Sequence, residues 1–259
     1  MSSALKSTSD GQTLILTISN PAFKNALSPE IYAAGVEALN AAETNPDIRS
    51  VIITGEGTTF CAGGNLQRLL ANRQQPKAVQ AQSIDGLHSW IDSIRTYPKP
   101  IIAAVEGAAA GAGFSLALAC DFCVAADDAV LVMSYSLVGL SPDGGGSWAL
   151  SRALPRALAN ELLMCGERIG AKRLFEVGLI NRICSSGGAL QEALALAARL
   201  NAGAPNVLAS IKELLNDSAN NTLSEHLQSE RDHFVRNLHH ANGGEGIDAF
   251  LAKRMPHYR

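Results

Sequence analysis

The stretch that decides the fold is residues 101–121, which read IIAAVEGAAAGAGFSLALACD. Its apolar start, at 101–105, lies directly after Pro100 and is typical of a buried strand. Small residues then occupy 107–113, where glycine and alanine let the backbone approach another body closely. The apolar run at 114–119 predicts a helix, whose first turn leaves backbone N–H groups without helical partners at the positive end of its dipole. This succession of strand, turn and helix predicts a site for a polarised oxygen or an anion.

A second glycine-rich stretch upstream follows the same plan. Residues 58–66, TTFCAGGNL, come shortly after an apolar strand predicted at 50–54. Two such turns, each following a strand, can aim two backbone N–H groups at one carbonyl oxygen. The two stretches together therefore predict an oxyanion hole.

Four segments, in this order and spacing, make the chain resemble the crotonase, or enoyl-CoA hydratase/isomerase, superfamily. They are residues 20–27 (NPAFKNAL), 60–66 (FCAGGNL), 99–121 and 139–145 (GLSPDGG). The resemblance covers nearly the whole chain, and its site pattern is most similar to the epoxyphenylacetyl-CoA isomerase-like members. It implies an acyl-CoA substrate and no permanently bound cofactor, with coenzyme A present only as part of the thioester.

Composition excludes several other classes of protein. The net charge of -3 over 259 residues argues against binding to nucleic acid or to an anionic membrane surface. No apolar run approaches the roughly 18–20 residues of a membrane span, and residues 1–10 lack the features of a signal peptide. The five cysteines are expected to be buried free thiols, and neither they nor the six histidines show metal-ligand spacing. We expect a cytoplasmic protein without a metal.

Periodicity predicts an α/β protein that ends in helices. Strands and helices alternate up to a last strand at 179–184, and a polar loop over the site is expected at 71–82, before a helix at 83–96. Four helices then follow, expected at 189–202, 205–216, 222–240 and 245–254. The resemblance sharpens this to a crotonase-like ββα spiral core at 1–200 with the acyl-CoA site. It implies that 201–259 form a helical oligomerisation region of a homotrimer, or of a hexamer built as a dimer of trimers.

The resemblance also implies where the chemistry lies. The backbone N–H groups of Gly64 and Ala112 fall at the two oxyanion-hole positions of the family. The two glutamates with which enoyl-CoA hydratases hold the attacking water fall on Ser115 and Tyr135, and neither of these is a carboxylate. Simple hydration of a 2-enoyl-CoA is therefore doubtful.

One acid remains at a matching position. Asp143 falls where double-bond isomerases of the family carry an aspartate. One carboxylate suits an isomerase that removes a proton from one carbon and returns it to another. The alternative is that Asp143 only forms a turn, because Pro-Asp-Gly is a good turn sequence.

Three other functions stay open. The 4-chlorobenzoyl-CoA dehalogenases resemble this chain in an aspartate at Asp143, an aromatic residue at Tyr135 and a histidine at His88, which would suit a hydrolase with an aspartate nucleophile. His88 could equally be a structural histidine of its helix. The chain could also be a hydratase that works without the glutamate pair, or a non-catalytic acyl-CoA binder. The position of Ser115 argues against a serine hydrolase, because it lies inside a predicted helix rather than on a sharp turn after a strand.

The residues that bind coenzyme A are the hardest to predict from the sequence. Its phosphates call for Lys or Arg, and the candidates are Lys24, Arg68 and Lys253, each of which could also be an ordinary surface charge. The two loops add further residues expected to flank the thioester and the pantetheine. These are Ala62, Gly64, Asn65, Leu66 and Ala112.

Overall fold

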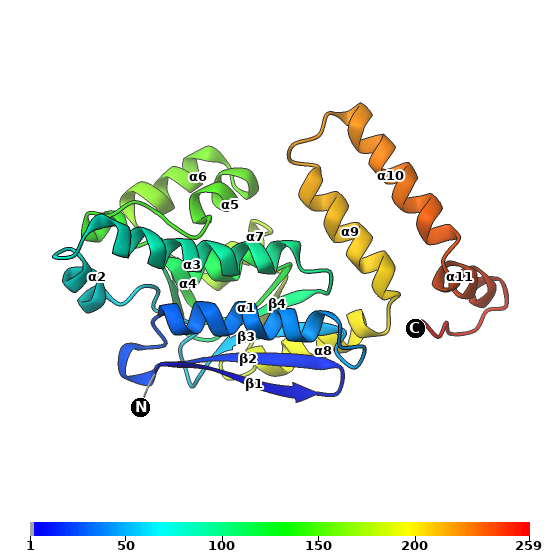
Figure 1. The fold of residues 1–259 in the computed structure, drawn as a ribbon, viewed down its shortest axis with the longest axis horizontal. Coiled ribbons are helices and arrows are strands. Elements are labelled where there is room, and N and C mark those ends of the chain that lie inside the picture. Colours follow the sequence, from blue (N-terminus) through cyan, green and yellow to red (C-terminus); the bar gives the residue numbers. More distant parts are fainter. Residues whose placement is uncertain (1–2) are drawn as a thin grey trace.

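A twisted six-stranded sheet organises the computed structural model, which describes residues 3–259 (Figure 1). Its first two strands form an antiparallel hairpin, and the other neighbouring pairs are parallel. In sheet order the strands are β1 (Ala4–Asp10), β2 (Thr13–Ser19), β3 (Ser50–Gly55), β4 (Ile101–Val105), β6 (Phe122–Ala126) and β9 (Arg182–Cys184). A smaller three-stranded sheet contains β5 (Ala108–Ala110), β7 (Val130–Val132) and β8 (Arg168–Gly170).

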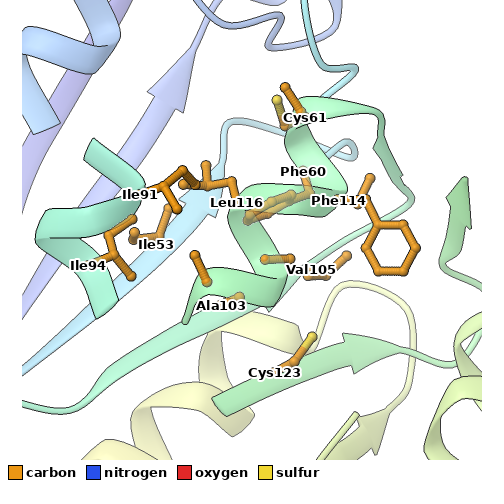
Figure 2. Packing of buried hydrophobic residues seen from close by; sticks show 14 of the residues in the cluster. Ile53, Phe60, Cys61, Ile91, Ile94, Ala103, Val105, Phe114, Leu116 and Cys123 are labelled. Atoms are coloured by element: carbon orange, nitrogen blue, oxygen red, sulfur yellow. The ribbon is translucent and has the colours of Figure 1, made fainter. Parts of the chain in front are cut away.

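Both faces of the central strands are covered, which explains why β3 and β4 are apolar along nearly their whole length. Ile52 and Ile102 pack with α8 (Ala189–Asn201) on one face. Ile53 and Ala103 belong to the larger core on the other face, with α1 (Pro29–Glu43), α3 (Lys77–Thr96) and α4 (Ala112–Ala119). Figure 2 shows part of this larger core, with Ile91 and Ile94 of α3, Phe114 and Leu116 of α4, and Val105 of β4.

The C-terminal helices extend away from this core (Figure 1). They are α9 (Pro205–Asp217), α10 (Leu223–Leu238) and α11 (Ala241–Leu251), and we call them the C-terminal arm. Pro205 opens α9 at its first position, and α10 begins with a capping box between Thr222 and Glu225. Between β7 and the arm lie three short helices, α5 (Gly146–Ala153), α6 (Arg156–Asn160) and α7 (Ala171–Glu176).

The predicted α/β class and crotonase-like fold are confirmed, but three local predictions were wrong. The segment at 71–82 is largely helical, because α2 (Leu66–Asn72) ends there and α3 begins at Lys77, directly after Pro76. Its polar residues predicted a loop, but in the structure they occupy exposed positions of the two helices. The last strand begins at Arg182 rather than at residue 179, and strands β5 and β8, of three residues each, were missed because they are too short for a period-2 pattern. Among the helices of residues 3–259, none is both long enough and apolar enough to cross a membrane.

Candidate active site

The two glycine-rich loops lie against each other. The Cys61 N–H donates to the Ala108 carbonyl at 3.0 Å, and the Ala110 N–H donates to the Cys61 carbonyl at 2.9 Å. Gly63 has a φ of 85°, and a Cβ added there would lie 2.5 Å from the carbonyl oxygen of Ala110 and 3.3 Å from the Ala112 nitrogen. Only glycine permits both this dihedral angle and this approach. The first loop is thereby held against the start of α4.

This contact leaves the two predicted oxyanion donors free. Ala112 is the first residue of α4, after Gly111 with its φ of 50°. Within residues 3–259, neither the Gly64 N–H nor the Ala112 N–H donates a hydrogen bond to another group of the chain. Both residues line one cavity of about 820 Å³. Unpaired N–H groups that face a cavity are suited to hold a developing oxyanion.

The cavity brings together most of the residues predicted from the sequence. Its walls come from the first loop, from α2 and α3, from the start of α4 and from the segment 134–143. The predicted residues that line it are Ala62, Gly64, Leu66, Arg68, His88, Ala112, Tyr135 and Asp143. Their roles stay predictions, but their placement in one cavity requires no rearrangement of the chain.

Three predicted residues do not line the cavity. The exposed Lys24 reaches the first loop only through its backbone carbonyl, which accepts the Ala62 N–H at 3.0 Å. The Asn65 side chain caps α2 by accepting the N–H groups of Gln67 and Arg68. Lys253 is exposed and follows the end of α11. Asn65 thus acts as a helix cap, a structural role that its position in the motif did not indicate.

Asp143 and Tyr135 form a hydrogen-bonded pair inside the cavity. The Tyr135 hydroxyl donates to Oδ1 of Asp143 at 2.5 Å, and the Ser115 hydroxyl donates to the backbone carbonyl of Asp143 at 2.9 Å. Burial raises the pKa of Tyr135, and the neighbouring Asp143 raises it further. Tyr135 therefore stays protonated and serves as a hydrogen-bond donor to the carboxylate. The two positions that resemble the glutamate positions of hydratases are here the supports of Asp143.

The comparisons with known proteins agree with this geometry. The sequence model of the family described as Enoyl-CoA hydratase/isomerase matches residues 9–259. The chain belongs to this family, the crotonase superfamily. It is therefore an acyl-CoA enzyme of the hydratase/isomerase type.

Relatives of this chain carry names of different reactions. A 1,2-epoxyphenylacetyl-CoA isomerase of Escherichia coli K12 is 35% identical over 95% of this chain and 94% of the relative. A 2,3-dehydroadipyl-CoA hydratase of the same strain is 34% identical over 96% of this chain and 95% of the relative. The crystal structure of an enoyl-CoA hydratase from Polaromonas sp. JS666 has 75% identity and a TM-score of 0.98, covering 98% of this chain and 99% of that one.

Some residues that line the cavity were not predicted from the sequence. Tyr32 of α1 and Ile84 and Leu87 of α3 line the cavity beside the predicted residues. Ile84 and Leu87 were part of an apolar helical stripe, which predicted core packing but not which residues would face a ligand. Tyr32 lies about 80 residues before Ala112 in the sequence, and no local signal links it to the site.

The expectation of buried cysteines was correct only for Cys61 and Cys123, because Cys120 and Cys184 are half-buried and Cys165 is exposed. All five are free, and burial raises the pKa of the Cys61 thiol to about 12 although it accepts the Gly63 N–H. Cys61 thus packs under the first loop as a small apolar side chain. Within residues 3–259, no three His, Cys, Asp or Glu side chains come together as a metal site.

Proposed function

We propose that this protein is an isomerase of an unsaturated or epoxide-bearing acyl-CoA, with Asp143 as its single proton-transfer group. The observation that carries the proposal is that, among the described residues 3–259, Asp143 is the only carboxylate that lines the cavity. Hydration by the glutamate-pair mechanism needs two carboxylates to hold a water, whereas proton transfer between two carbons needs one base. An aromatic-derived acyl group fits the apolar lining provided by Leu66, Ile84 and Leu87.

The chemistry follows from three groups. The carbonyl oxygen of the thioester accepts hydrogen bonds from the N–H groups of Gly64 and Ala112, which lowers the energy of its enolate. Asp143 takes a proton from a carbon next to the acyl π-system and becomes a neutral acid. It then returns this proton to another carbon as the enolate collapses. No water enters the product, and the carboxylate is regenerated.

Tyr135 keeps the base in position during this cycle. Its hydroxyl holds Oδ1 of Asp143, which leaves Oδ2 for the substrate proton. The Ser115 hydroxyl fixes the backbone carbonyl of the same residue. A base whose rotamer is locked by its neighbours loses little entropy when the substrate binds, which supports transfer along a defined path.

A second function has one observation in its favour. His88 of α3 lines the same cavity as Asp143, so an aspartate nucleophile with a histidine base remains a candidate for acyl-CoA hydrolysis. A hydratase is favoured by the names of the relatives rather than by this geometry. Both alternatives add a water to the substrate, so one labelling experiment separates them from isomerisation.

That experiment is mass spectrometry of the products formed in ¹⁸O-labelled water. The substrates are 2-enoyl-, 3-enoyl- and ring-epoxide phenylacetyl-type CoA esters. We expect an unchanged mass with an altered retention time for at least one ester. Incorporation of labelled oxygen into the acyl product would overturn the isomerase proposal. A labelled carboxylic acid with release of free coenzyme A would indicate the Asp143–His88 hydrolase.

Substitution of Asp143 separates an enzyme from a binder. The Asp143→Asn variant should bind CoA esters but lose roughly 10²- to 10⁴-fold in kcat, because the amide cannot accept the proton. Asp128→Asn is a matched control, since Asp128 is an exposed turn residue that does not line the cavity. Unchanged turnover in Asp143→Asn would remove Asp143 from the mechanism.

A further inference from the structure

Arg68 occupies a different place from the one expected of a contact to coenzyme A phosphate. It lies on the first turn of α2, four residues after Gly64, and its guanidinium lines the cavity together with Tyr32, Tyr135 and Asp143. Its Nε and Nη1 atoms are buried from solvent. An arginine that binds a phosphate at the entrance of a site would have these nitrogens exposed to solvent.

Among the described residues 3–259, the guanidinium has no carboxylate partner. Nε and Nη1 form no hydrogen bond, and Arg68 forms no ion pair within 4.0 Å. Buried arginines are ordinarily matched by a carboxylate, because removing a charge from water is costly unless its hydrogen-bonding groups are satisfied. An arginine that lines a ligand cavity without a carboxylate partner in the chain therefore indicates that the ligand supplies the missing counter-charge.

The neighbours of Arg68 define its end of the cavity. Burial raises the pKa of Tyr32, a hydrogen bond with Arg68 and the charge of Arg68 lower it, and the charge of Asp143 raises it, so Tyr32 lies near both groups. Glu30, the nearest acid on α1, is exposed and feels the charge of Arg68 without pairing with it. Arg68 and Tyr32 thus line the same cavity as Asp143 and are neighbours of each other.

We propose that Arg68, assisted by the Tyr32 hydroxyl, binds a carboxylate at the far end of the acyl group, so that the preferred substrates are CoA thioesters of dicarboxylic acids. The proposal rests on the proposed thioester site. A carboxylate is the ligand that fits best, because its two oxygens match the planar N–H groups of a guanidinium. The phenolic hydroxyl adds a donor from α1. The apolar side chains of Ile84 and Leu87 line the same cavity and suit the methylene chain between the two acyl ends.

Binding of saturated esters tests this without depending on turnover. Isothermal titration calorimetry would compare dicarboxylic monothioesters, succinyl- to suberoyl-CoA, with monocarboxylic esters of the same carbon number, butanoyl- to octanoyl-CoA. The proteins are the wild type, Arg68→Met, Arg68→Lys, Tyr32→Phe and the control Arg73→Met. Arg73 is exposed at the end of the same helix and lines the same cavity, so the control removes an equal charge from a different place.

We expect the wild type to prefer the dicarboxylic ester at one chain length or more. Arg68→Met should weaken the binding of that ester roughly 10- to 100-fold, because a charged hydrogen bond is lost. The affinity for the matched monocarboxylic ester should change by less than about threefold. Arg68→Lys and Tyr32→Phe should each keep part of the preference for the dicarboxylic ester. Arg73→Met should keep all of it.

Three results would overturn the proposal. The wild type could bind both series equally, which would indicate that a water satisfies Arg68. Arg68→Met could weaken the binding of both series and of free coenzyme A to the same extent, which would indicate that Arg68 binds a phosphate of coenzyme A. Finally, coenzyme A and all its esters could fail to bind, which would remove the proposed thioester function itself and this inference with it. The second result leaves the thioester function standing, so the two failures are distinguishable.

Discussion

At the scale of single residues, the site depends on what supports Asp143. The Tyr135 hydroxyl donates to its Oδ1 atom at 2.5 Å. In Tyr135→Phe the carboxylate loses this donor, so its position in the cavity is no longer fixed. We expect kcat/KM to fall roughly 10- to 100-fold, as for the loss of one charged hydrogen bond.

Tyr97 provides the matched control for this prediction. Its hydroxyl is also buried, but it has no hydrogen-bond partner within residues 3–259 and does not line the cavity. Tyr97→Phe should leave kcat/KM unchanged and keep or increase stability in urea, because a buried unpartnered hydroxyl costs roughly 1–3 kcal/mol. An equal loss of activity in both variants would mean that Tyr135 acts only through packing.

Sequence reasoning reached these residues unevenly. Asp143, Tyr135 and the two N–H donors were predicted because the resemblance to the superfamily assigns these positions. Tyr32 and the lack of a carboxylate partner for Arg68 were not predicted, since both depend on how distant parts of the chain pack around the cavity. A sequence shows which residues carry charge, but the counter-charge comes from tertiary packing.

At the scale of elements, the site requires two loops to stay in contact. Gly63→Ala would place a methyl group 2.5 Å from the Ala110 carbonyl oxygen, at a φ of 85°. Gly57→Ala is a matched control, since Gly57 also has a positive φ, of 75°, but no atoms lie within 4 Å of an added Cβ.

We expect Gly57→Ala to lose only about 1 kcal/mol of stability from backbone strain. Gly63→Ala should lose more, and its kcat should fall because Gly64 and Ala112 move apart. Chemical denaturation and steady-state kinetics measure the two effects. Equal behaviour of the two variants would show that contact between the loops is not required.

A second element-scale contact fastens the C-terminal arm to the core. Lys212 of α9 donates to the Ile94 carbonyl and to Oδ2 of Asp121, at 2.8 Å each. Burial raises the pKa of Asp121, and the charge of Lys212 is the largest influence that opposes this rise. Ionised Asp121 is thus tolerated in the fold largely because Lys212 neutralises it.

Lys212→Met should therefore reduce stability in a pH-dependent way. At pH 7 the loss should be about 3 kcal/mol, as for a buried ion pair that loses one partner. A raised folded pKa favours the fold only where the carboxyl is protonated, so the loss should shrink as the pH falls to about 4. Lys172→Met, which breaks the exposed pair with Asp127, should change stability by less than about 1 kcal/mol at either pH. A loss that is the same at both pH values would contradict the assigned role of Asp121.

At the scale of the whole molecule, sequence patterns predicted the class of fold better than the residues at which its helices and strands begin and end. The switch from alternating strands and helices to helices alone was visible because it spans many residues. The start of α3 was not, because its polar first turns lie on the protein surface and carry no apolar stripe. The surface that the C-terminal arm offers to other chains is also a property of the folded molecule.

That surface leads to the last prediction. The arm exposes many large apolar side chains, among them Ile211, Leu215, Leu227, Phe234, Val235 and Phe250. Exposed apolar side chains gathered on one part of a molecule mark an interaction surface. We propose that the arm packs against other copies of the chain in a trimer or hexamer. Light scattering after size exclusion should give three or six times the 27.2 kDa of one chain.

Substitution within α10 tests whether the arm forms that interface. Phe234 is 68% exposed in the single chain, and Phe234→Glu would bury a charge if copies associate there, so we expect smaller particles at low micromolar concentration. Gln228→Glu places the same charge at an exposed polar position of the same helix and should leave the mass unchanged. A monomeric wild type would overturn the proposed assembly. A trimer unaffected by Phe234→Glu would place the interface elsewhere on the molecule.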